Sequence, residues 1–165
     1  MKINKLNLEG IWTALATPFN SQKEIDWQAF DKLLLQQKNA KTTGIVLSGT
    51  TGEAPTLSPQ EKLSLIRRAK ALVGASLQVM SGGTGQDTHQ SVEFAKLARD
   101  AGADSLLVVT PPYNKPNFKG LKEHYRLIAK SFAKDVCLYH VPGRTSLRLS
   151  SQELSEIASL PHITM

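Results

Sequence analysis

The sequence has a single cysteine, few aromatic residues (6%) and no long hydrophobic run. Cys137 has no partner for an intramolecular disulfide, and its place in an apolar stretch predicts a small buried side chain. No apolar run is long enough to span a membrane, and residues 1–9 lack the hydrophobic core and cleavage site of a signal peptide. We therefore expect a cytoplasmic protein that does not interact with a membrane.

The charged residues do not predict a nucleic-acid or metal site. Lys and Arg number 20 against 14 Asp and Glu, giving a net charge of +6, but they are scattered along helical patterns. The basic cluster at residues 67–70 lacks the interleaved aromatic side chains of a single-strand binding platform. The four histidines do not group with acidic residues at metal-ligand spacing. We expect no nucleic acid, metal or cofactor, only weak attraction to anionic metabolites.

The 165 residues alternate between strand-like and helix-like patterns with a repeat of about 30 residues. Such alternation is typical of β-α units in a parallel sheet, and the length suits one domain. Asp26 and Ser150 are expected N-caps, and Ser58 with Glu61 forms a capping box. The expected strands cover residues 10–16, 44–47, 77–81, 105–109, 135–140 and 162–165.

Helical patterns follow the strands. One begins at Asp26, one runs from Ser58 to a stop at Gly74, and one begins at Ser150. Two more are expected at about residues 88–101 and 118–132. On the helix at 88–101, the expected apolar side chains are Val92, Ala95 and Leu97.

Several strand segments are apolar without alternation, which predicts burial on both faces. Two α/β architectures bury strands in this way, the doubly wound open sheet and the β/α barrel. Neither nucleotide signature of the open sheet is present, because no Gly-x-Gly-x-x-Gly follows the first strand and no Gly-Lys-Ser/Thr loop occurs. The glycine-rich turn at residues 82–85 is by itself a weak signal for phosphate.

Two hydroxyl-bearing segments follow predicted strands. Thr50 and Thr51 lie in a Gly-Thr-Thr-Gly-Glu turn, where hydroxyl and backbone N–H groups can bind a carboxylate. The alternative is an ordinary turn whose threonines only satisfy the backbone. Tyr139 ends a strand, so its hydroxyl can reach the mouth of a site, or it is a core tyrosine with one satisfied hydroxyl.

Two loop residues complete the candidate set. Arg144 lies in a Pro-Gly turn, and its guanidinium can bind a carboxylate through two hydrogen bonds, although a surface arginine is the alternative. Tyr113, in Pro-Pro-Tyr-Asn, is an expected exposed aromatic of the kind that marks an interface.

Together these motifs resemble the dihydrodipicolinate synthase family of class I pyruvate-dependent aldolases and lyases. The matching segments keep the family order over nearly the whole chain: residues 10–11, 17–19, 49–53, 83–85, 110–116 and 139–145. The resemblance implies a (β/α)8 barrel in which a lysine forms a Schiff base with pyruvate. The resulting enamine adds to aspartate semialdehyde, a step in lysine and diaminopimelate biosynthesis.

The resemblance also implies roles for the candidate residues. A relay of hydroxyl groups would move protons during Schiff-base formation, through Tyr139, Thr50 and a tyrosine lent across a dimer interface, Tyr113. Thr51 would hold the pyruvate carboxylate, and Arg144 the carboxylate of aspartate semialdehyde. The family assembles as a dimer of dimers, so a homotetramer is expected.

The chain also departs from the family pattern. The Schiff-base lysine of the family aligns about two residues beyond Met165, and the chain supplies five β/α units and the start of a sixth strand rather than the eight strands of a barrel. We therefore expect residues 1–165 to be the amino-terminal portion of one barrel domain, inactive alone. Alternatives are an N-acetylneuraminate lyase or keto-deoxy-sugar aldolase of the same superfamily, or a non-catalytic interaction module; Arg144 favours the synthase.

Two further differences concern regulation and the tyrosine loop. Members of the family that lysine inhibits use a histidine, asparagine, glutamate and tyrosine pocket, and the corresponding residues here are Pro59, Asp87, Gln90 and Pro112. Lysine feedback therefore has little support. His140 replaces the asparagine that usually follows the tyrosine.

Overall fold

Five parallel strands form one sheet in a computed structural model that describes residues 6, 7 and 9–164. Their order in the sheet is their order in the chain, β1-β2-β3-β4-β5. A doubly wound sheet would reverse its strand order and place helices on both faces, so the architecture is a partial (β/α)8 barrel. The strands are β1 Trp12–Ala14, β2 Gly44–Leu47, β3 Gln78–Ser81, β4 Ser105–Val109 and β5 Val136–Tyr139.

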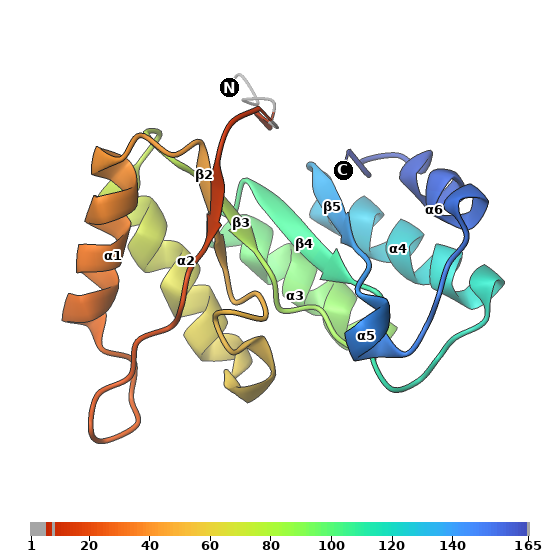
Figure 1. Cartoon of the computed structure of the whole chain (residues 1–165), viewed down its shortest axis with the longest axis horizontal. Coiled ribbons are helices and arrows are strands. Elements are labelled where there is room, and N and C mark those ends of the chain that lie inside the picture. The colour runs from red at the N-terminus through yellow and green to blue at the C-terminus, as the bar shows by residue number, and fades with distance from the viewer. Residues whose placement is uncertain (1–5, 8, 165) are drawn as a thin grey trace.

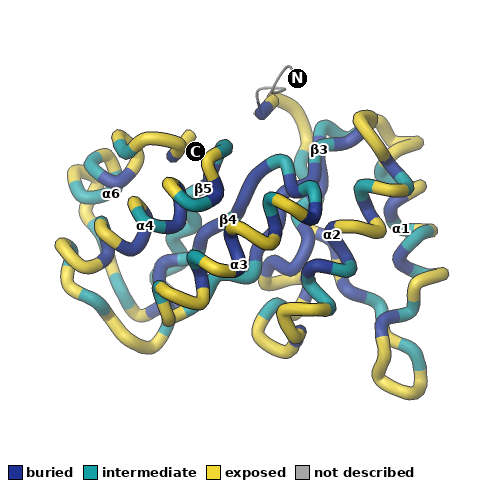
Figure 2. Tube along the Cα trace, turned by 180° about the vertical axis from the view of Figure 1, so that it is seen from behind, coloured by how far each residue is buried: buried dark blue, intermediate teal, exposed yellow. Residues whose placement is uncertain are grey.

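The helices cover one face of this sheet. Figure 1 shows the strands at the centre with α2, α3 and α4 behind them, and Figure 2 shows the same helices from the other side. The main helices are α1 Trp27–Asn39, α2 Pro59–Val73, α3 Thr88–Asp100, α4 Phe118–Phe132 and α6 Ser151–Ala158. Two short helices that the sequence did not predict lie in loops, η1 Ala54–Thr56 and α5 Pro142–Thr145.

The expected caps are confirmed. The Asp26 side chain accepts from the amide of Ala29 at 2.9 Å, which starts α1. Capping boxes are present at Ser58 with Glu61 and at Ser150 with Glu153. Each satisfies amide groups that a helix start otherwise leaves unpaired, and Gly74 ends α2 as expected.

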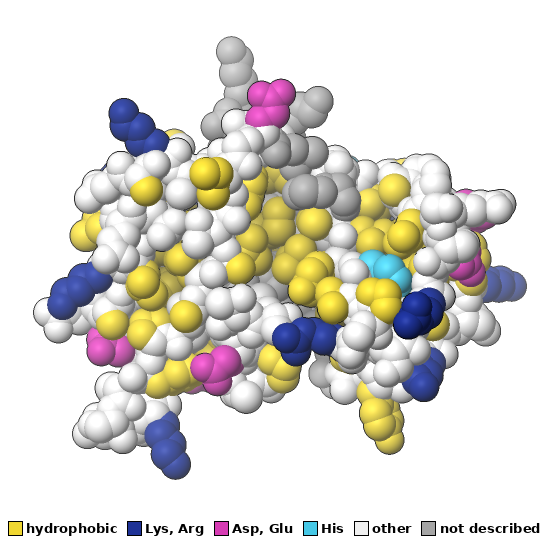
Figure 3. Space-filling model, in the orientation of Figure 1, with side chains coloured by type: hydrophobic (Ala, Val, Ile, Leu, Met, Phe, Trp, Pro, Cys, Tyr) yellow, Lys and Arg dark blue, Asp and Glu magenta, His cyan; other side chains and the backbone are white. Residues whose placement is uncertain are grey.

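Between helices and sheet lie two hydrophobic clusters. One joins α3, α4 and α6 to β4 around Tyr125, Phe132 and Leu106, and the other joins α1 and α2 to β2 and β3 around Phe30 and Leu34. The opposite face of the sheet carries a smaller cluster, Leu6, Met80 and Cys137, with Trp12, Val46 and Leu107 only partly covered. Figure 3 shows hydrophobic side chains gathered in the middle of this face. Cys137 is buried, as predicted.

Two expectations about burial are wrong in detail. Leu97, expected on the apolar face of α3, is 46% exposed, because Phe94, Ala95 and Ala98 face the core instead. The inner faces of the strands are not fully buried, since no layer covers Val46 and Leu107 within the described part of the chain.

The expected sixth strand at residues 162–165 is not a strand in the described part of the chain. Ile163 makes a single parallel bridge with Val136, and Met165 lies outside the described residues. His162 has φ +69°, so the backbone leaves the extended conformation just before the bridge. The expected strands at residues 44–47 and 105–109 are confirmed with the same ends, and the strands expected at residues 10–16, 77–81 and 135–140 are confirmed but are shorter by one or two residues at one or both ends.

Candidate active site

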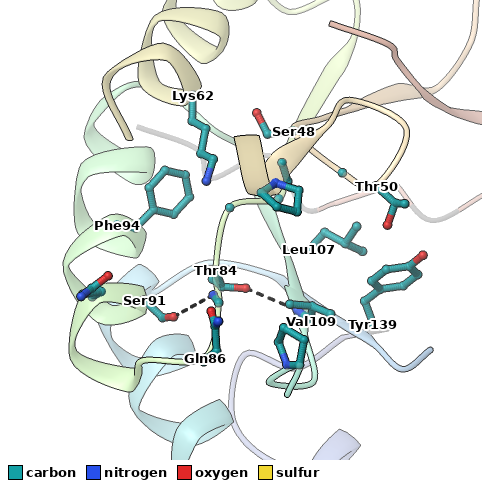
Figure 4. Close-up of a pocket in the computed structure, with 18 of the residues that line it drawn as sticks. Ser48, Thr50, Lys62, Thr84, Gln86, Ser91, Phe94, Leu107, Val109 and Tyr139 are labelled. Atoms are coloured by element: carbon teal, nitrogen blue, oxygen red, sulfur yellow. Dashed lines mark hydrogen bonds between the residues drawn. The ribbon is translucent and has the colours of Figure 1, made fainter. Parts of the chain in front are cut away.

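A cleft of about 880 Å³ opens at the carboxyl ends of the strands. Its walls come from the turns after β2 and β3, the ends of β4 and β5, and the facing sides of α2 and α3. Figure 4 shows side chains from these elements converging on it. Sites in parallel α/β proteins form at this edge because the loops that follow the strands meet there.

The turn after β2 is held in a shape that presents Thr50 to the cleft. The amide of Glu53 donates to the Thr50 carbonyl at 3.2 Å, and Glu53 takes a left-handed φ of +57°. The Thr17 hydroxyl donates to the Gly52 carbonyl at 2.8 Å. A Cβ atom at Gly52 would lie 3.0 Å from the Leu15 carbonyl oxygen, so the close packing of this turn favours glycine.

Tyr139 ends β5, paired in register with Val109 of β4. Its side chain lines the cleft, and Figure 4 shows its hydroxyl pointing toward the side chain of Thr50. Within the described residues neither hydroxyl makes a hydrogen bond to another protein group. Both are therefore free to bond a ligand or each other.

Arg144 also lines the cleft, from the short helix α5. The Thr145 hydroxyl, in a buried residue, donates to the Val141 carbonyl at 3.1 Å, and the Arg144 amide donates to the same carbonyl at 2.9 Å. This anchored turn leaves the exposed guanidinium at the mouth of the cleft, where it can bind an anion.

Thr51 and Tyr113 are not brought into this cleft. Thr51 is exposed beside Thr50 but does not line the cavity. Tyr113 is 88% exposed and has φ +71°, a strained backbone conformation for an aromatic residue. The amide of Asn114 donates to the Pro112 carbonyl at 2.8 Å across this tight turn, which projects the ring away from the chain.

A lysine that the sequence analysis did not single out lines the same cleft. Lys62 lies on α2, and Figure 4 shows its ammonium group extended into the space beside Phe94. Burial lowers the pKa of Lys62, and attraction to the neighbouring Glu61 opposes this shift. Gly83, at φ +125°, leaves room for both side chains, since a Cβ there would lie 2.7 Å from the Phe94 ring. An amphipathic helix pattern gives no sign of which lysine will face a cavity.

The cleft is also lined by the four residues that the family resemblance led us to expect at the lysine-binding pocket, Pro59, Asp87, Gln90 and Pro112. The fold brings these residues together from separate parts of the chain, namely α2, the start of α3 and the loop after β4. Within the described residues, no group of three or more His, Cys, Asp or Glu could hold a metal ion. In that same part of the chain, no helix is both long and apolar enough to cross a membrane.

Known proteins resemble this chain over nearly its whole length. The profile of the Dihydrodipicolinate synthetase family matches residues 7–165. A 4-hydroxy-tetrahydrodipicolinate synthase from Bdellovibrio bacteriovorus is 40% identical over 154 residues, 93% of this chain and 52% of that protein. A chloride-inhibited dihydrodipicolinate synthase from Acinetobacter baumannii, solved in complex with pyruvate, has a TM-score of 0.91 at 36% identity and covers 95% of this chain and 54% of its own.

A more distant relative has a different ligand. CdNal from Clostridium difficile, solved in complex with mannosamine, has a TM-score of 0.87 at 26% identity, with 95% of this chain and 55% of that chain covered. The chain thus spans about half the length of the relatives it matches. Since the family profile covers nearly every residue, the chain belongs to the dihydrodipicolinate synthetase family.

Proposed function

We propose that this chain supplies the proton relay and the carboxylate-binding arginine of a 4-hydroxy-tetrahydrodipicolinate synthase, which condenses pyruvate with aspartate semialdehyde. The observation that carries the proposal is the meeting of Thr50, Tyr139 and Arg144 at one cleft from three separate loops. Residues 1–165 would be the amino-terminal portion of a single β/α-barrel domain, in keeping with the half-length match to the relatives.

The chemistry accounts for these residue types. Attack of an amine on the pyruvate carbonyl gives a carbinolamine, which becomes a Schiff base when it loses its hydroxyl as water. Each step moves a proton, and the Tyr139 and Thr50 hydroxyls are free to carry it. Arg144 would bind the carboxylate of the aldehyde substrate through its guanidinium. Thr51 would hold the pyruvate carboxylate by its backbone and hydroxyl groups.

Tyr113 has its proposed role in an assembly. Its 88% exposure suits a side chain that completes the relay in a neighbouring subunit rather than in its own. We therefore propose a homo-oligomer, with two subunits sharing each relay and a dimer of dimers as the whole, acting in the cytoplasm.

Borohydride trapping tests which lysine supplies the amine that forms the Schiff base with pyruvate. The family resemblance assigns the Schiff-base lysine to a position beyond Met165, so pyruvate with borohydride is expected to leave the 18.0 kDa mass of this chain unchanged. Within the described residues, Lys62 is the lysine that lines the cleft. A single adduct that maps to Lys62 would contradict the proposal and make this residue the nucleophile.

A chimaera tests the reaction itself. In it, this chain replaces the matching part of the Acinetobacter baumannii synthase, which supplies the remainder of the barrel. The folded chimaera is expected to condense pyruvate with aspartate semialdehyde. Arg144→Gln is expected to raise KM for the aldehyde at least about tenfold while pyruvate still forms an adduct, because one bidentate ion pair is lost.

The same chimaera separates the synthase from its alternative. The likeness to CdNal favours, as a second candidate, a lyase acting on a sugar acid such as N-acetylneuraminate. Cleavage of N-acetylneuraminate with no condensation of aspartate semialdehyde would establish that candidate. Loss of both activities in a chimaera that folds would favour a non-catalytic interaction module.

A further inference from the structure

His140 joins two segments that flank the cleft. It follows Tyr139 directly, and its Nδ1 atom lies 3.3 Å from the hydroxyl oxygen of Thr110 at the end of β4. On the other side of the ring, Nε2 accepts a hydrogen bond from the Leu149 amide at 3.3 Å. The ring therefore bridges nine residues of chain, from the end of β5 to the residue before the α6 cap.

The surrounding hydrogen bonds fix which ring nitrogen carries the proton. A backbone amide can only donate, so Nε2, which takes the Leu149 amide hydrogen, must offer its lone pair, and the hydrogen of a neutral ring is then on Nδ1. Nδ1 donates to the Thr110 hydroxyl oxygen. The hydrogen of Thr110 is left for the Tyr125 hydroxyl at 3.2 Å or the Tyr139 carbonyl at 3.5 Å.

This tautomer suits the Leu149 contact and no other protonation state does. A neutral ring with its hydrogen on Nδ1 accepts the Leu149 amide hydrogen. A doubly protonated ring would place an N–H group against that N–H group, and the bond would be lost. Tyr125 of α4 shares the Thr110 hydroxyl with the ring, Tyr139 precedes His140 in the chain, and Arg144 and Arg148 belong to the bridged segment.

The bridged segment carries Arg144. Its first residues form α5, which is pinned from within by the Thr145 hydroxyl. The far end is held by the Leu149 amide, which donates to His140, and by the Leu147 and Leu149 side chains, which pack against the core cluster that includes Leu106 of β4. Arg144 therefore lies between two fixed points, and the position of α5 at the cleft depends on both.

We infer that His140 is a positioning residue, which in its neutral Nδ1–H form clamps residues 141–149 and so holds Arg144 at the cleft. The clamp rests on the hydrogen bonds alone, whereas its consequence for the aldehyde substrate rests on the proposed function. The sequence shows His140 in place of the usual asparagine but does not reveal that the ring spans to Leu149.

Nuclear magnetic resonance on this chain tests the clamp without an activity. The ¹⁵N shifts of His140 are expected to show the hydrogen on Nδ1 near neutral pH. His140→Phe keeps a ring but removes both hydrogen bonds, so exchange of the Leu149 amide is expected to quicken roughly fivefold or more. His140→Gln, which retains a donor and an acceptor, is expected to recover part of that protection. Amides of α1 serve as the control for global folding.

Two results would overturn the inference. One is a ring with its hydrogen on Nε2, and the other is Leu149 exchange in His140→Phe that equals the parent while α1 stays protected. In the chimaera, His140→Phe is expected to raise KM for aspartate semialdehyde and to leave pyruvate adduct formation intact. An inactive parent chimaera would refute the proposed function but leave the clamp standing, since the exchange experiment decides it separately.

Discussion

A buried histidine makes the stability of this chain depend on pH. His124 on α4 is 3% exposed, and its ring lies edge-on to Tyr125 with centroids 5.9 Å apart. Nδ1 is 2.9 Å from the Thr88 hydroxyl, whereas Nε2 has no hydrogen-bond partner within the described residues. Burial lowers the pKa of His124 from 6.5 to about 4, and attraction to Asp87 opposes the shift only in part.

The sign follows from which state binds the proton. Below pH 6.5 the unfolded chain protonates His124 while the folded chain does not, so the free energy of unfolding decreases as pH falls toward 4. Above pH 6.5 both states are neutral and the histidine contributes no pH dependence. At about 1.4 kcal/mol per pH unit, the loss is about 2 kcal/mol at pH 5 and approaches ~3 kcal/mol near pH 4.

Urea unfolding at several pH values between 7 and 4.5 measures this loss. Carboxylates titrate in part of the same range, so the informative quantity is the difference between the parent and His124→Gln, which keeps a polar contact for Thr88. Between pH 7 and 5 the parent is expected to lose about 2 kcal/mol more than this variant. His89→Gln, at an exposed position of α3, is the matched control and should follow the parent. Parallel curves for parent and His124→Gln would refute the reasoning.

Two substitutions and one ligand titration test the packing, the cap of α2 and the cleft. A Cβ at Gly82 would collide with the Ser48 carbonyl, so Gly82→Ala is expected to lower the unfolding free energy by roughly 1–3 kcal/mol. Gly85→Ala meets no atom within 4 Å, and a similar loss there would show that the collision is not the cause. Ser58→Ala removes the cap of α2 and should cost about 1 kcal/mol in urea unfolding, whereas an unchanged midpoint would argue against the cap. Calorimetric titration with L-lysine should give no saturable heat, since the Lys62 ammonium lines the cleft, and a Kd below about 1 mM would contradict this.

The helix starts could be predicted because their causes are local. Ser58 and Glu61 lie three residues apart, and the two hydrogen bonds between them need nothing from the rest of the fold. The end of the predicted sheet failed for the opposite reason. A strand at residues 162–165 depends on pairing along β5, and within the described residues Ile163 makes a single parallel bridge to Val136, next to the left-handed backbone of His162. Leu97 shows the same limit, since spacing identifies apolar positions but not which of them the neighbouring helix covers.

The residues of the candidate site show the same contrast between local and long-range causes. Residues at strand ends are placed by register: once Tyr139 pairs with Val109, its side chain must emerge at the cleft edge, beside the turn that follows β2. Thr51 and Tyr113 lie in loops, whose side chains are placed by whatever they pack against, and neither packs into the cleft of this chain. Their proposed roles need a surface outside the described residues. For Arg144, also in a loop, the fold provides that surface internally, through Thr145 and the His140 ring. Among the five candidate site residues, the position of Arg144 should therefore be the most sensitive to substitutions at residues that never touch a substrate.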